Sequence, residues 1–284
     1  MEAPTSNIKS QQVSDYPFIH SNSIMLSAKV LAVLGIFRIT AQAQSVLTVR
    51  KFVSTMIVPA FPVESGLSFH ALWPGLQPTG DAFVYQNVID DYYPTGTNTR
   101  WDVSTWYGPY DAAGDYTEYS TSPVTPGDYI TTDFQFYAPT NTWTETQIIE
   151  PKASGTASGE SPSTTSISVS FKNFPNNADA LTEFLFVIEL QLAATWNFGS
   201  FTFHSIIMTA NTTNTAWCSA PYYQGSFTHS ITTPVATVVN GQCQCYVAQL
   251  TFIAPTTNSA LSPAAAAASV GNGNVTRGPI KFTG

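Results

Sequence analysis

The stretch Trp101-Asp-Val-Ser-Thr-Trp-Tyr107 decides the fold class, because apolar and polar side chains alternate along it. This period of two is the pattern of a half-buried β-strand. A second alternating run, Tyr129–Tyr137, follows directly after the tight turn Pro126-Gly127-Asp128. The two segments predict strands that lie with one face against a core.

Similar apolar or β-branched runs continue in both directions along the chain, separated by turns rich in Pro, Gly, Ser and Asn. The further predicted strands are 46–58, 69–73, 82–89, 141–149, 166–171, 183–192, 199–209, 226–239 and 245–253. We expect 152–165 to be an exposed loop, and helical periodicity is almost absent. Ten or more strands at regular spacing predict an all-β fold, an antiparallel two-sheet β-sandwich.

The composition supports this prediction and narrows the class of partner. Only 10% of the 284 residues are charged and 13% are aromatic, which favours strands over helices. The formal net charge is −8 with ten Lys and Arg in all. Nucleic-acid binding requires basic residues that neutralise phosphates, so we expect no nucleic-acid partner.

The chain divides into three segments. Residues 1–43 are an N-terminal extension plus a secretory signal peptide, whose start we place at Met25. The apolar run Val30–Phe37 and the small-x-small sequence Ala41-Gln42-Ala43 support this interpretation, and a buried helix is the alternative. The run is too short to span a bilayer, so no membrane association is expected after its removal. Residues 44–255 form the sandwich, and 256–284 are predicted to be a flexible tail.

Secretion gives meaning to two further features. In an oxidising compartment we expect a disulfide between Cys218 and either Cys243 or Cys245. Asn211-Thr-Thr and Asn274-Val-Thr are sequons for N-glycosylation. The four histidines are widely separated and predict no metal site.

Gln86 is the first candidate for a functional residue, because it stands in the apolar segment Val84–Ile89. A buried amide without a partner costs about 1–3 kcal/mol, so this residue serves either structural pairing or chemistry.

The carboxylates do not form an obvious glycosidase pair. Glu183 and Glu189 share one strand face but are separated by roughly 20 Å, beyond the spacing that such a pair requires. For Glu189 the simplest interpretation is exposure to water at the end of a strand.

The order of six motifs resembles the eqolisins, the glutamic peptidases. The motifs are Trp73-Pro-Gly-Leu76, Gln86 in an apolar strand, Trp106-Tyr107, Pro126-Gly-Asp128, Glu183-Phe-Leu185 and Asn197-Phe-Gly-Ser200. The resemblance implies a secreted, acid-acting endopeptidase with a concanavalin A-like sandwich (jelly roll). It places Gln86 and Glu183 at the catalytic pair and Trp73, Trp106 and Tyr107 along the substrate cleft. It implies a polypeptide substrate and no metal or organic cofactor. We also expect a monomer.

Three positions depart from the family pattern. Gln77 and Gly108 stand where the family has acids, and Val187 replaces a second acid on the strand of Glu183. Two other functions therefore stay open. The aromatic-rich concave face suits a carbohydrate-binding or cell-wall-associated protein whose partner is a polysaccharide. The third hypothesis is a secreted structural protein without a ligand.

Overall fold

The computed structural model describes ten segments of the chain, all between Leu47 and Phe282. They are 47–62, 68–79, 83–91, 100–108, 116–170, 180–192, 194–219, 221–223, 227–255 and 276–282. The first half contains β1 (Val49–Ile57), β2 (Ser68–Gln77), β3 (Val84–Asp90), β4 (Trp101–Gly108), β5 (Thr117–Val124), β6 (Tyr129–Tyr137), η1 (Ala138–Thr140) and β7 (Thr142–Glu150). The second contains α1 (Ala153–Ala157), β8 (Ser163–Ser170), β9 (Glu183–Leu192), β10 (Phe201–Ala210), η4 (Ala216–Ser219), β11 (Tyr222–Tyr223), β12 (Thr228–Ile231), β13 (Val235–Val239), β14 (Gln242–Ile253) and β15 (Thr276–Phe282). None of the described helices is both long and apolar enough to cross a membrane.

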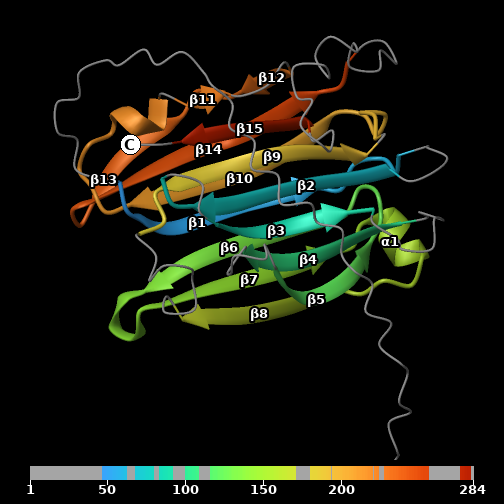
Figure 1. The fold of residues 1–284 in the computed structure, drawn as a ribbon, viewed down its shortest axis with the longest axis horizontal. Coiled ribbons are helices and arrows are strands. Elements are labelled where there is room, and N and C mark those ends of the chain that lie inside the picture. The colour runs from blue at the N-terminus through green and yellow to red at the C-terminus, as the bar shows by residue number, and fades with distance from the viewer. Residues whose placement is uncertain are drawn as a thin grey trace, which may run out of the picture.

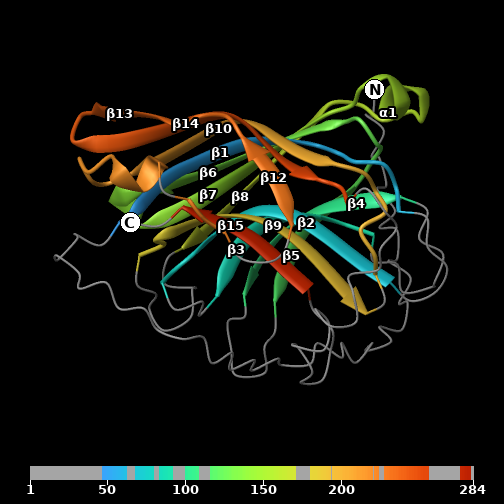
Figure 2. The same ribbon diagram turned by 90° about the horizontal axis from the view of Figure 1, so that it is seen from above.

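The strands form two antiparallel sheets, as the alternating pattern predicted. The eight-stranded sheet has the order β12-β14-β10-β1-β6-β7-β8, with β13 also paired to β14. The seven-stranded sheet has the order β11-β15-β9-β2-β3-β4-β5. Figure 1 shows the two sheets one over the other, and Figure 2 shows them from above as separate layers. The fold is therefore the predicted two-sheet β-sandwich.

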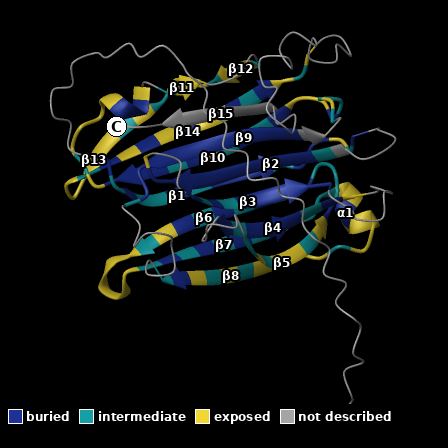
Figure 3. Cartoon of the chain, in the orientation of Figure 1, coloured by how far each residue is buried: buried dark blue, intermediate teal, exposed yellow. Residues whose placement is uncertain are grey.

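The main core lies between the inner faces of the two sheets. Its largest fully buried side chains are aromatic: Trp101, Trp143, Tyr85, Phe52, Phe83, Phe134, Phe184, Phe186, Phe198, Phe201, Phe203 and Phe252. In Figure 3 burial is greatest on the central strands and falls toward β5 and β8 at the sheet edges. Burying side chains of this size supplies most of the stabilisation of such a sandwich.

The two outer faces differ in character. The outer face of the eight-stranded sheet carries rows of hydroxyls that bond across strands, among them Thr55 with Thr131 and Thr202 with Thr251. The outer face of the seven-stranded sheet instead carries a second apolar cluster of Ala71, Trp73, Val88, Leu185 and Val187. Residues 183–190 of β9 are consequently buried on both faces of the sheet.

The structure corrects four details of the predicted segments. β5 was not predicted. The segment expected to be a loop contains α1 and the beginning of β8. The strand predicted at 226–239 is divided into β12 and β13. Part of the segment expected to be a flexible tail is the strand β15, which pairs with β9 from Thr276 to Phe282.

The disulfide alternative is decided in favour of Cys245, which is bonded to Cys218 with the two Cα atoms 5.5 Å apart. The bond joins η4 to β14, whereas Cys243 is a buried free thiol. Of the two sequon residues, Asn211 is exposed directly after β10, and Asn274 lies outside the described residues. The segment 1–43 with its predicted signal also lies outside them.

Candidate functional site

The strand register brings the two residues of the predicted catalytic pair to one face. Gln86 of β3 lies opposite Gly75 of β2, which lies opposite Leu185 of β9. Glu183 is two residues before Leu185 and therefore points to the same side of the sheet. This is the outer face of the seven-stranded sheet, because Leu185 belongs to its second apolar cluster. The two side chains start two strands apart, roughly 10 Å across the sheet.

Gly75 keeps the strand between them free of a side chain beside Gln86. A β-carbon at this position would lie 3.1 Å from Cβ of Gln86, 3.1 Å from Cε3 of Trp73 and 3.0 Å from the carbonyl oxygen of Tyr85. These distances are shorter than ordinary carbon contacts, so a larger residue would displace its neighbours. Glycine at residue 75 therefore lets Gln86 and the ring of Trp73 pack closely over β2.

Gln86 and Trp106 form the β3 and β4 side of the site. They are register partners, and both are half-buried. The amide oxygen Oε1 of Gln86 is buried and has no hydrogen-bond partner among the described residues. An amide oxygen in this state costs free energy unless a bound molecule satisfies it.

Glu183 forms the β9 side of the site and is hydrogen-bonded to Gln77, which the sequence identified only as a departure from the family pattern. The side-chain Nε2 of Gln77 donates to Oε2 of Glu183 over 2.5 Å. The two residues are register partners on β2 and β9, and they are only 7% and 9% exposed. The sequence alone gave no signal for this contact, because it depends on the pairing of segments 106 positions apart.

The other predicted cleft residues divide between the two faces of the sheet. Trp73 lies on the outer face with Gln86 and is 6% exposed. Tyr107 lies on the inner face, in the main core, where its ring stacks on Tyr119. The expectation that Tyr107 lines the same cleft as Gln86 therefore does not match its position.

Glu189 is also placed differently from its expectation. It is 7% exposed rather than open to water, and it is in register with Ala71 on the outer face. Glu183 is in register with Gln77, six positions earlier on β2. The two carboxyls of β9 are thus well separated along one strand, as the sequence spacing predicted.

A third carboxylate, Glu145 of β7, lies between the two sheets. Its Oε1 accepts a hydrogen bond from Asn87 (3.0 Å), and its Oε2 accepts one from Thr105 (2.7 Å). Burial raises the pKa of Glu145 to about 7, although both hydrogen bonds oppose the shift, and Asp133 adds a smaller increase. Glu145 faces the core and cannot act together with Glu183 on the outer face.

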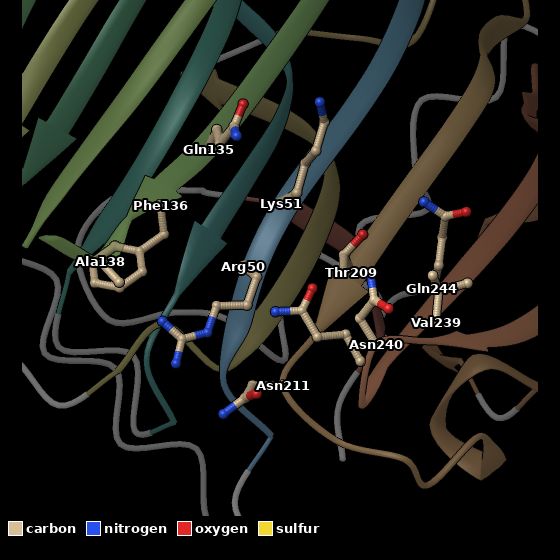
Figure 4. Close-up of a pocket in the computed structure, with 11 residues that line it drawn as sticks. Arg50, Lys51, Gln135, Phe136, Ala138, Thr209, Asn211, Val239, Asn240 and Gln244 are labelled. Carbon is tan, nitrogen blue, oxygen red and sulfur yellow. The ribbon is translucent and has the colours of Figure 1, made fainter.

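A hollow of about 580 Å³ lies on the other side of the molecule, at the end of the eight-stranded sheet. Figure 4 shows that its lining is mainly basic and amide side chains, including Arg50, Lys51, Gln135 and Gln244. Of the predicted site residues only the sequon Asn211 lines it. Basic and amide side chains of this kind bind anionic and polar groups.

Within the described segments, no three His, Cys, Asp or Glu side chains are grouped as metal ligands. Near Gln86, the outer face of the seven-stranded sheet carries the carboxylate of Glu183 held by an amide, a second amide with an unsatisfied oxygen, and two tryptophan rings. Such a set can position a water molecule and donate hydrogen bonds to a carbonyl oxygen.

No model of a protein family and no curated protein sequence matches this chain. Its fold is similar to that of solved glutamic peptidases. One is scytalido-glutamic peptidase with a transition state analog inhibitor, which is 15% identical to this chain and has a TM-score of 0.38. The match covers 70% of this chain and 93% of that chain. Another is SCP-B, a member of the eqolisin family, in a complex with the tripeptide Ala-Ile-His. It is 14% identical to this chain, the match covers 70% of this chain and 92% of that chain, and the TM-score is 0.35. At this identity the similarity concerns the fold alone.

Proposed function

We propose that this chain is a glutamic-peptidase-like endopeptidase that hydrolyses peptide bonds with Glu183 and Gln86. The observation that carries the proposal is their common location on the outer face of the seven-stranded sheet, on strands separated only by β2. An acid and an amide on one face are the minimum set for activating water against a carbonyl.

In the proposed reaction Glu183 acts as the general base. It accepts a proton from a water molecule while the water oxygen attacks the peptide carbonyl carbon. Gln86 donates a hydrogen bond through its amide nitrogen to the oxyanion that develops, and its unsatisfied Oε1 helps to hold the water. Glu183 then transfers its proton to the leaving amine, so that the peptide bond breaks and both groups return to their initial states. Trp106, half-buried beside Gln86, would contact the substrate.

The test is cleavage of an acid-denatured protein by the purified chain at about pH 4, because a substrate must be unfolded to enter an extended site. We expect Glu183→Gln and Gln86→Ala each to lower the initial rate at least a hundredfold. Matched controls are Glu150→Gln and Gln135→Ala, which make the same changes at exposed positions outside this site. Equal rates in wild type, Glu183→Gln and Gln86→Ala would contradict the proposal.

A second candidate function is carbohydrate binding, with a polysaccharide as the partner. The half-exposed ring of Trp106 on the outer face of the seven-stranded sheet favours it, because flat aromatic rings stack on sugars. Pull-down with insoluble polysaccharides, comparing wild type with Trp106→Ala, is the test. Trp106→Ala is more informative than Trp73→Ala, since Trp73 is nearly buried and its truncation also removes core contacts. Binding that Trp106→Ala abolishes, without any proteolysis, would favour this function.

We also propose that the chain is secreted, which the Cys218–Cys245 disulfide supports because disulfides persist in oxidising compartments. N-terminal sequencing of the protein from the medium of an expressing culture should then find Gln44 as the first residue. Intact mass before and after glycosidase treatment would report whether Asn211 and Asn274 carry glycans. A protein that remains inside the cell with residues 1–43 attached would contradict secretion.

A further inference from the structure

The contact between Gln77 and Glu183 is a buried bond from an amide to a carboxylate. Nε2 of Gln77 is the donor, Oε2 of Glu183 is the acceptor, and both residues are at least nine-tenths buried. Hydrogen bonds to a charged acceptor are roughly twice as strong as neutral ones, and burial strengthens them further. The bond therefore restricts the direction in which the carboxylate of Glu183 points.

The backbone on both sides of this contact is held by three further bonds. The backbone N–H of Thr182 donates to the carbonyl oxygen of Gln77 over 3.0 Å. The hydroxyl oxygen of Thr182 accepts from the backbone N–H of Thr79 at 2.7 Å and lies 2.8 Å from the hydroxyl of Thr79. The end of β2 and the beginning of β9 are thus joined next to the two side chains. A side-chain bond between segments that are already fixed needs little additional ordering.

We infer that Gln77 is a positioning residue for Glu183, an inference that rests on the proposed function. By occupying Oε2, the amide of Gln77 directs Oε1 of Glu183 toward the water that the base activates. An amide does this without a titrating proton. A carboxylic acid at residue 77 would do so only while the two carboxyls share a proton, because two carboxylates in contact cannot both be ionised.

The experiment compares Gln77→Leu and Gln77→Glu with wild type in a steady-state assay on a fluorogenic peptide across the active pH range. We expect Gln77→Leu to lower kcat at least tenfold and to change KM less than about threefold, because the base is misdirected while the binding face is retained. The matched control is Gln147→Leu. It makes the same change at a buried glutamine, 1% exposed, between the two sheets.

The pH profile of Gln77→Glu separates positioning from a structural role. Unlike wild type, whose amide at residue 77 does not titrate, this variant should be active at acid pH and lose activity as the pH rises. The reason is that its paired carboxyls give up their shared proton as the pH rises. Thermal unfolding of each variant shows whether it folds. If Gln77→Leu does not, the nearly isosteric Gln77→Glu still provides the test.

The outcomes distinguish this inference from the proposed function. If wild type cleaves, Glu183→Gln does not, and both Gln77 variants keep the wild-type kcat and pH profile, the positioning role is wrong while the peptidase proposal stands. If wild type does not cleave at any pH, both proposals fall. The side-chain amide signal of Gln77 in an NMR spectrum then reports whether its bond to Glu183 is purely structural.

Discussion

At the scale of single residues, Gly75 is the position where the site depends most on the absence of a side chain. We predict that Gly75→Ala lowers the stability by roughly 1–3 kcal/mol, because its Cβ would press on Gln86, Trp73 and the backbone at Tyr85. Peptide cleavage should fall with it, since Gln86 is displaced. Chemical denaturation and the rate on a fluorogenic peptide measure the two effects. Wild-type stability together with wild-type activity would show that the close packing beside Gln86 is not needed.

Glu145 makes a prediction about pH. Its pKa is raised from the ordinary 4.5 to about 7 in the folded state, so the folded protein holds a proton that the unfolded chain has lost between these values. The stabilisation is present below about pH 4.5 and is lost as the pH rises toward 7. We therefore compare the free energy of unfolding of Glu145→Gln with that of wild type at each pH. The difference in favour of the variant should be larger at pH 8 than at pH 4, by up to about 3 kcal/mol.

Urea unfolding of wild type and Glu145→Gln at both pH values measures this difference. Hydrogen bonds of Glu145 that the amide of Glu145→Gln does not reproduce are lost at both pH values. Their loss therefore cancels when the results at the two pH values are compared. Two parallel stability curves over this range would mean that Glu145 titrates normally in the fold.

The sequence predicted part of the site at this scale. The family resemblance, rather than strand alternation, assigned Gln86 and Trp106 to one site, and the structure pairs them in register on β3 and β4. Strand alternation puts consecutive residues on opposite faces, so Tyr107 points into the core when Trp106 points out of it. The bond between Gln77 and Glu183 was out of reach, because the register of β2 against β9 is a tertiary property.

At the scale of elements, β15 gives the clearest prediction. We expect truncation after residue 275 to lower the melting temperature by roughly 4 °C or more, because it removes the strand that pairs with β9 and leaves that strand at a sheet edge. Truncation after Phe282 is the control and should have no effect. Differential scanning calorimetry decides between the outcomes, and equal melting temperatures would show that β15 contributes nothing to the sheet.

The elements that sequence analysis missed share a physical cause. β5 is an edge strand with only one buried residue, Val124, so its residues show no apolar period. Its strand conformation comes from pairing with β4. The long run 226–239 is interrupted before Val235 because Pro234 lacks the N–H that a continuous strand would use. Central strands were predictable because burial selects their residues, whereas edge strands depend on their neighbours.

At the scale of the whole molecule, stability should depend little on salt. Three ion pairs between described residues are at least partly exposed, namely Lys51–Asp133, Arg100–Asp102 and Lys152–Glu150. Exposed pairs contribute about 0–1 kcal/mol each and are screened by salt. We expect the melting temperature to change by less than about 3 °C between roughly 0.05 and 1 M NaCl. A larger fall would show that surface charge contributes more than this structure indicates.

The double burial of β9 has a consequence for how this protein can change over generations. A strand with solvent on one side can exchange half of its residues at little cost, whereas residues 183–190 have no such side. Inherited variation should therefore accumulate on the hydroxyl rows of the opposite sheet, where one small polar group can replace another. Among homologues of this protein, β9 should be the segment whose sequence changes most slowly, even in homologues that have no catalytic activity.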